Sequence, residues 1–134
     1  MTMYIGFTPD GRSLVEASGS GKIRIWDIAS GTEARVLHSP PKQSGVTYVL
    51  RCAALSPDGK FLAVSTYSSA EPSETRNRVM LWDVTAGRPL GGVVADSLAL
   101  AFSPDGQWLA LGHIQYGGGQ IRIYRTSELR SAQS

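Results

Sequence analysis

The tripeptide Pro-Asp-Gly occurs three times in this chain, and its copies begin 48 and 47 residues apart. A fixed period of this length indicates a structural unit that is repeated and that buries its apolar surface against neighbouring units. Within each copy, Pro presets the backbone of a type I turn, Asp accepts hydrogen bonds from nearby backbone, and Gly adopts the positive φ that lets a hairpin return. The sequence therefore predicts three copies of one hairpin unit. The turn residues are Pro9, Asp10, Gly11, Pro57, Asp58, Gly59, Pro104, Asp105 and Gly106.

Each tripeptide is followed by an apolar strand, a turn and an alternating strand that ends on an aromatic residue. These aromatic residues and their successors are Trp26 and Asp27, Trp82 and Asp83, and Tyr124 and Arg125. A further turn leads into a fourth strand near residues 33–37 in the first copy and 88–94 in the second. The third copy has only a short polar remainder at the corresponding place, so it lacks a clear outer strand.

This succession of turn, strand and aromatic residue resembles the WD-repeat family of β-propellers. The resemblance implies an all-β fold in which each blade is a sheet of four antiparallel strands. It divides the single domain 1–134 into three blades, at residues 3–37, 46–94 and 97–134. In the family, a Ser or Thr on the second strand holds the indole of the tryptophan, and Ser18 and Thr66 occupy that position here. His113 stands there in the third copy.

Composition and charge exclude several classes of function. The chain has 134 residues, 42% of them apolar, and a net charge of +2 from scattered Lys and Arg. Scattered charge gives no electrostatic footprint for nucleic acid, and no apolar run reaches the roughly 18 residues of a membrane span. The single cysteine, Cys52, and the lack of a secretory leader lead us to expect a cytoplasmic protein.

No group of residues predicts catalysis, a metal or a cofactor. The only histidines, His38 and His113, fall in different repeats without the spacing of metal ligands. Cys52 lies in a strand expected to be buried, where thiols are inert. Residues 19–22 have the composition of a phosphate loop, but a strand follows in place of the required helix. We therefore expect a protein that is not an enzyme; a site in the central channel is the alternative, with Arg51 as its polar candidate.

The repeats differ most in the connection between their second and third strands. This connection holds four residues in the first repeat, twelve at 67–78, which we expect to be a mobile surface loop, and seven at 114–120. A long connection at 38–45 joins the first two blades, and the family resemblance places all of these loops on one rim. Tyr and Arg are enriched in binding hot spots. The candidate partner-binding residues are Tyr48, Arg51, Tyr67, Arg76, Arg78, His113 and Tyr116, and unselected loop growth is the alternative.

Three blades are fewer than the four to eight, roughly, that close a propeller. The end blades are expected to expose apolar faces that need a cover. The first hypothesis is a non-enzymatic interaction scaffold that completes its ring by self-association, two chains giving six blades and three giving nine. The second is a fragment or subunit of a larger or heteromeric propeller, whose function lies in the parent or partner. A protein or peptide of unknown identity is the further partner that the family resemblance implies.

Overall fold

The computed structural model describes residues 1–38, 48–72, 74–115 and 118–131, which form three antiparallel sheets and a short C-terminal helix. The first sheet contains β1 (Thr2–Phe7), β2 (Ser13–Ser18), β3 (Lys22–Asp27) and β4 (Thr32–His38). The second contains β5 (Val49–Leu55), β6 (Phe61–Tyr67), β7 (Asn77–Asp83) and β8 (Arg88–Val94). The third contains β9 (Ala99–Phe102), β10 (Trp108–Gln115) and β11 (Gly118–Arg125), and α1 (Thr126–Ser131) follows it. The predicted all-β blades are confirmed.

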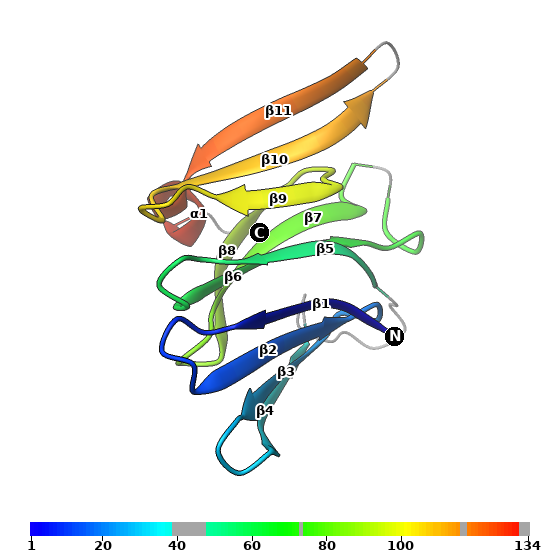
Figure 1. Ribbon diagram of the computed structural model, residues 1–134. Coiled ribbons are helices and arrows are strands. Elements are labelled where there is room, and N and C mark those ends of the chain that lie inside the picture. Colours follow the sequence, from blue (N-terminus) through cyan, green and yellow to red (C-terminus); the bar gives the residue numbers. More distant parts are fainter. Residues whose placement is uncertain (39–47, 73, 116–117, 132–134) are drawn as a thin grey trace.

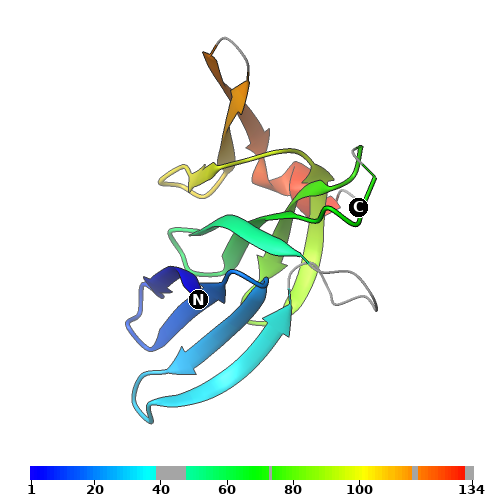
Figure 2. The same ribbon diagram turned by 90° about the vertical axis from the view of Figure 1, so that its right-hand side faces the viewer.

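The three sheets fan out from their first strands, which run side by side as in a propeller (Figures 1 and 2). β1 contacts β5, and β5 contacts β9. Every sheet is a meander in which each strand pairs with the next one in the chain. The Pro-Asp-Gly turns therefore lie at one edge of the fan, on the left of Figure 1, and the connections between second and third strands lie at the opposite edge.

Alternation along the strands gives each blade two faces, and we name them by the neighbour that each one meets. The following face of the first blade carries Val15, Ile23 and Ile25, which are buried against the second blade. Its preceding face, on the opposite side of the same sheet, carries Thr2, Ile5, Phe7, Leu14, Glu16, Arg24 and Trp26. The same alternation gives the third blade a following face of Ala99, Ala101, Trp108, Ala110, Gly112, Ile121, Ile123 and Arg125.

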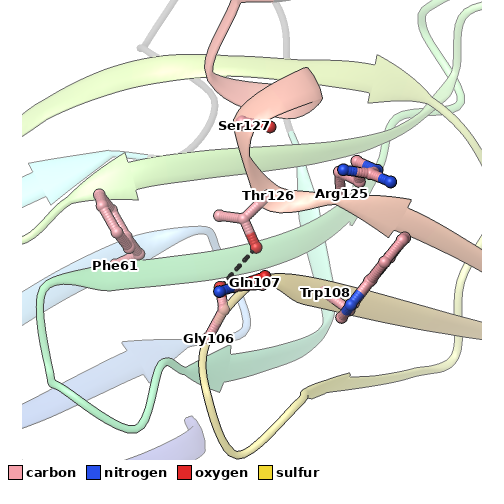
Figure 3. A pocket seen from close by; sticks show the side chains of 7 residues that line it. All are labelled: Phe61, Gly106, Gln107, Trp108, Arg125, Thr126 and Ser127. Atoms are coloured by element: carbon pink, nitrogen blue, oxygen red, sulfur yellow. Dashed lines mark hydrogen bonds between the residues drawn. The ribbon is translucent and has the colours of Figure 1, made fainter.

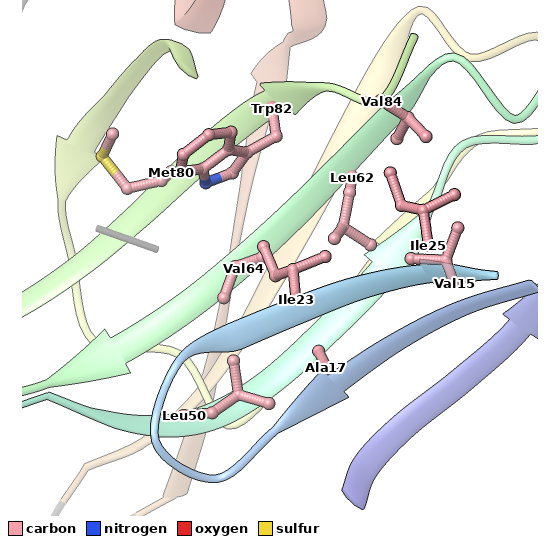
Figure 4. Close-up of a cluster of buried hydrophobic side chains, with 10 residues drawn as sticks. All are labelled: Val15, Ala17, Ile23, Ile25, Leu50, Leu62, Val64, Met80, Trp82 and Val84. Carbon is pink, nitrogen blue, oxygen red and sulfur yellow. The ribbon is translucent and has the colours of Figure 1, made fainter. Parts of the chain in front are cut away.

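Two separate apolar cores join the three blades. The core between the first and second blades is made of Val15, Ala17, Ile23, Ile25, Leu50, Leu62, Val64, Met80, Trp82 and Val84 (Figure 4). The core between the second and third blades is made of Ala63, Val79, Leu81, Ala95, Leu109, Leu111 and Leu129. Each blade therefore obtains its burial from a neighbouring blade, because one flat sheet has no interior of its own.

The three Pro-Asp-Gly turns share one hydrogen-bonding pattern. The glycine N–H donates to the carbonyl three residues earlier at 2.9 Å in each turn, and the three glycines have φ of 70°, 74° and 73°. Each aspartate accepts a hydroxyl from two residues before it and a backbone N–H from two residues after it. The sequence period therefore corresponds to a repeated local structure, as predicted.

Two connections that we expected to be loops are more ordered. β6 includes Tyr67 and β7 begins at Asn77, so the second blade's hairpin takes up both ends of the predicted loop 67–78. Within the remainder, the Ser68 N–H donates to the Arg76 carbonyl at 2.9 Å, which extends the backbone pairing of the hairpin beyond Tyr67 and Asn77. In the third blade, β10 and β11 pair as far as Gln115 and Gly118, which turns most of the predicted loop 114–120 into hairpin. Backbone pairing at such hairpin ends leaves no apolar signature in the sequence.

The third sheet has three strands in the described part of the chain, in agreement with the missing outer strand of the prediction. After β11 the chain forms α1, which packs against β7 and β8 of the second blade. Leu129 of this helix is 1% exposed and belongs to the core between the second and third blades. The helix was not predicted, because six residues are too few to show a helical period.

Candidate interaction surface

We define the loop rim as the edge that carries the connections β2–β3, β6–β7, β8–β9 and β10–β11. It lies opposite the Pro-Asp-Gly turns (Figure 1). Six of the seven candidate partner-binding residues fall on or next to this rim within the described residues. Tyr116 lies outside them.

Arg51 is the centre of one cluster on the loop rim. It is the extra residue at an irregularity of β5, between Leu50 and Cys52, which directs its side chain out of the regular pairing. Its guanidinium lies 4.9 Å from the centre of the Tyr67 ring, a cation–π distance. Arg51 Nη1 is also 3.7 Å from Asp96 Oδ1, and His113 Nδ1 is 3.8 Å from Asp96 Oδ2. The structure thus brings three of the predicted residues together around Asp96, which the sequence analysis missed.

Tyr48, Arg76 and Arg78 belong to a second cluster on the same rim, held by the β6–β7 connection. Tyr48 is buried, with 7% of its surface exposed, and its hydroxyl donates to Glu71 Oε1 at 2.9 Å. Burial, the Glu71 hydrogen bond and the Glu71 charge together raise the pKa of the Tyr48 hydroxyl. Arg76 Nη2 donates to the Glu71 carbonyl at 3.5 Å and Arg78 Nε to the Thr75 carbonyl at 3.4 Å. These side chains order the connection in the free chain.

Buried polar atoms without a hydrogen-bond partner gather on this rim in the described part of the chain. They are Thr66 Oγ1, Arg76 Nε, Asn77 Oδ1, Asp96 Oδ1 and both ring nitrogens of His113. Buried polar groups in folded proteins are nearly always paired. All of these atoms belong to residues of the second and third blades or of the connection between them. The unpaired donors and acceptors therefore lie on the part of the rim that these two blades form.

The tryptophan network differs from the one that the family resemblance implies. Trp26 Nε1 donates to Glu16 Oε1 at 3.3 Å, whereas Ser18 Oγ contacts Ser20 Oγ and the Lys22 carbonyl. Glu16 is the diagonal cross-strand neighbour of Trp26 on the preceding face, which explains their contact. Thr66 Oγ1 makes no hydrogen bond within the described residues. The expectation that Ser18 and Thr66 hold the two indoles was therefore wrong.

Two cavities lie near the Pro-Asp-Gly turns. The one between the second and third blades has a volume of about 300 Å³ and is lined by Phe61, Gly106, Gln107, Trp108, Arg125, Thr126 and Ser127 (Figure 3). Thr126 Oγ1 donates to the Gly106 carbonyl at 2.7 Å at its base, and the Arg125 guanidinium lies 4.9 Å from the Trp108 ring. The other, of about 540 Å³, lies between the turns of the first and second blades. Both are lined mainly by turn backbone and paired side chains.

The groups that could serve chemistry are held in structural contacts. Cys52 Sγ donates to the Ser97 carbonyl at 3.6 Å, and burial raises the pKa of its thiol, which disfavours the reactive thiolate. No group of three His, Cys, Asp or Glu side chains within the described ranges could hold a metal ion. In the same ranges, no helix has the length and apolar character to cross a membrane.

The end sheets present their apolar faces to solvent. On the preceding face of the first blade, Ile5 and Phe7 are 61% and 67% exposed. On the following face of the third blade, Ile121 and Ile123 are 74% and 64% exposed. The equivalents of Ile121 and Ile123 in the second blade, Val79 and Leu81, are each 1% exposed. Contiguous apolar surface of this kind marks an interaction site.

Meandering blades, a repeated turn and face-to-face apolar contacts define a β-propeller repeat protein. A family model, the WD domain, G-beta repeat, matches residues 3–27 and 92–125, and these two matches support the assignment of the chain to the WD-repeat family. The matched segments contain β1 to β3 of the first blade and the whole third sheet. No curated protein matches the chain. WD repeats generally serve as protein-interaction scaffolds and are typically not catalytic.

Proposed function

We propose that this protein is a non-enzymatic interaction scaffold whose two end faces bind further propeller blades and whose loop rim binds a protein or peptide. The exposed preceding face of the first blade and following face of the third blade carry the proposal. Both faces are formed by the same repeat positions as the faces that pack against each other between the blades of this chain. Homo-oligomerisation supplies the covering blades from other copies of the same chain.

The alternative keeps the same end faces but takes the covering blades from a longer parent chain or from a different protein. In that case the biological role belongs to the parent or partner. An enzyme with a site in the central channel has less support, because Arg51, its polar candidate, is already engaged by Tyr67 and Asp96. The single cysteine, half-buried and hydrogen-bonded, supports the proposal of a reducing cytoplasmic location.

The mass of the protein in solution tests the proposed end-face association. Light scattering coupled to size exclusion, at several concentrations, should give a mass above the 14.3 kDa of one chain. A monomer that binds an apolar fluorescent dye would favour blades from another protein over homo-oligomerisation. A monomer without dye binding would contradict both forms of the proposal, because its end faces would need no cover.

Binding at the rim is tested with a displayed library of random peptides. Peptides selected on the wild-type protein should lose about tenfold or more in affinity on Arg51→Ala and on Tyr67→Ala, since hot-spot side chains contribute at least about 1.4 kcal/mol each. Arg88→Ala is the matched control, because Arg88 is an exposed arginine at the start of β8 near the opposite edge. Equal loss with all three variants would contradict binding at the rim.

A further inference from the structure

We infer that the end faces bind a second copy of this chain head to tail, so that two chains close one ring of six blades. In this ring the following face of the third blade packs on the preceding face of the first blade of the other copy, and this contact occurs twice. The inference rests on the proposed function, which leaves the source and number of the covering blades open. It is drawn from the chain's own two blade interfaces, which serve as internal templates for the missing one.

The Pro-Asp-Gly turns provide the first template. A Cβ atom built on Gly59 would lie 2.6 Å from Pro9 Cδ of the preceding turn, and one on Gly106 would lie 3.9 Å from Pro57 Cδ. Gly11 has nothing within 4 Å of the same position. Each turn thus rests on the proline of the turn before it, and only the first turn lacks that neighbour. A second copy in head-to-tail register places its Pro104 against Gly11.

The turns after the third strands show the same asymmetry. Gly87 of the second blade is contacted by the side chain of Arg35, which comes from β4 of the first blade. Gly31, its equivalent in the first blade, has nothing within 4 Å of its Cβ position. Both glycine turns of the first blade therefore have free space at the side from which a preceding blade approaches.

Side-chain size is complementary between the two exposed faces. Along the first strands, alignment of the repeats pairs Tyr4 of the first blade with Ala53 of the second, and both pack against the first core. The same alignment pairs Cys52 of β5 with Leu100 of β9, and these two strands are in contact. In each pair a large or medium side chain meets a smaller one. The proposed contact continues the series with Ala99 of the third blade opposite Ile5 of the other copy. Pairs of nearly constant total volume are what equally spaced sheets require.

The remaining residues of the two faces extend this complementarity. The third blade offers small residues at Ala101, Ala110 and Gly112 on β9 and β10, beside the larger Trp108. The first blade projects Ile5 and Phe7 from β1. A contact between two identical first-blade faces would instead oppose these large side chains to each other and would place two copies of the Glu16 carboxylate on the same surface. Head-to-tail packing avoids both conflicts.

The charged residues on the preceding face have partners within their own blade. Glu16 accepts hydrogen bonds from Thr2 Oγ1 and Trp26 Nε1, and these bonds lower the pKa of its carboxyl, the Thr2 contact most strongly. Arg24 Nε lies 3.7 Å from Glu33 Oε2. Because a buried charge requires partners, these contacts allow the face to be covered by an apolar sheet.

The number of copies follows from the size of a closed ring. Two copies of a three-blade chain give six blades, which is within the range of about four to eight that propellers use. Three copies would give nine, which exceeds that range. Because a head-to-tail contact either closes into a ring or continues as an open chain of subunits, the two-copy ring is the assembly within this range of blade numbers that leaves no end face exposed.

The test uses one charged substitution on each face. Ile5→Asp on the preceding face and Ile123→Asp on the following face should each convert the dimer to a monomer, because both interfaces of a head-to-tail ring contain both faces. An equimolar mixture of the two variants should form a heterodimer, since one undamaged face from each chain can still meet. Mass is measured by light scattering coupled to size exclusion, and folding by circular dichroism. Val94→Asp, on the outer strand of the second blade, is the matched control and should stay dimeric.

Each other outcome has a defined meaning. If only one variant loses association, or the mixture does not recover it, the head-to-tail arrangement is overturned while end-face association stands. If neither variant changes the mass of an associated wild type, the proposed function fails as well. A monomeric wild type, or a trimer, overturns the two-copy ring. Should the aspartate variants not fold, Phe7→Lys and Ile121→Lys, at the more exposed positions of the two faces, replace them in the same design.

Discussion

Three aspartates, Asp10, Asp58 and Asp105, have the same role in this protein at the residue scale. Each closes a turn by accepting a hydroxyl hydrogen bond and a backbone N–H, and each has a pKa below the ordinary value of 3.8. For Asp10 and Asp105 the hydroxyl contact is the largest cause. For Asp58, burial has the largest effect and raises the pKa, but the bonds from Ser56 and Lys60 outweigh it together.

The lowered pKa values predict sensitivity to acid. A carboxyl with a pKa that is lower in the folded state stabilises the fold above its unfolded pKa, and this contribution is lost as pH falls through the folded value. The free energy of unfolding should therefore be constant from neutral pH to about pH 4 and should fall below that. Asp58→Asn should cost about 1 kcal/mol at pH 7 and reduce the acid loss. Denaturant midpoints from pH 2 to 7 measure both effects; an acid slope that is unchanged in the variant would contradict the assignment.

Two glycines in equivalent turns should respond differently to alanine. Gly11 and Gly59 have similar positive φ, so Ala imposes similar backbone strain at both. At Gly59, Ala also meets Pro9, which should add roughly 1–3 kcal/mol of overpacking. Chemical denaturation of the two variants at a dilution where the chain is monomeric checks this difference. At concentrations where chains associate, Gly11→Ala should weaken association, since Pro104 of a second copy would then occupy the same space.

At the scale of elements, the hairpins were predictable and their ends were not. The strands follow from alternation and the turns from Pro, Asp and Gly, all of which are local signals. The Glu16 contact to Trp26 and the position of Asp96 between Arg51 and His113 depend on register and on packing between blades. The loop lengths predicted one shared rim for all seven candidate residues, and the six that lie within the described residues are found there. Local sequence signals could not show how these side chains are paired.

The C-terminal helix should contribute to the stability of the whole fold and not only to that of its own short segment. Leu129 is almost fully buried between the second and third blades, so Leu129→Ala should cost about 2–5 kcal/mol. Glu128→Ala is the control on the same helix. Glu128 is exposed, with its carboxylate 4.0 Å from Arg125, and pairs of this kind contribute about 1 kcal/mol or less. Thermal unfolding compares the variants, and equal losses would show that α1 is not anchored by Leu129.

At the scale of the whole molecule, the blades depend on one another. Both cores lie between sheets, so a blade with a neighbour on one side only buries apolar side chains on that side only. The first and third blades are in that position on one face each. Their stability should therefore depend on whatever covers them.

This dependence predicts an unfolding temperature that varies with protein concentration. Association that is restricted to the folded state stabilises it by mass action. The midpoint of thermal unfolding should rise by a few degrees for about a tenfold increase in the concentration of wild-type protein. Ile5→Asp should show a midpoint that does not depend on concentration, and Val94→Asp should follow the wild type. A wild-type midpoint independent of concentration would contradict stabilisation by self-association.

The third sheet ends at β11, which has no neighbouring strand on its outer side within the described residues. An open edge with exposed Ile121 and Ile123 can pair with any extended chain and so can nucleate aggregation. Arg122 and Arg125 on the same strand place positive charge along this edge, and like charges keep such edges apart. High salt screens that repulsion. The protein should therefore precipitate most readily in concentrated salt and should be most soluble in dilute buffer.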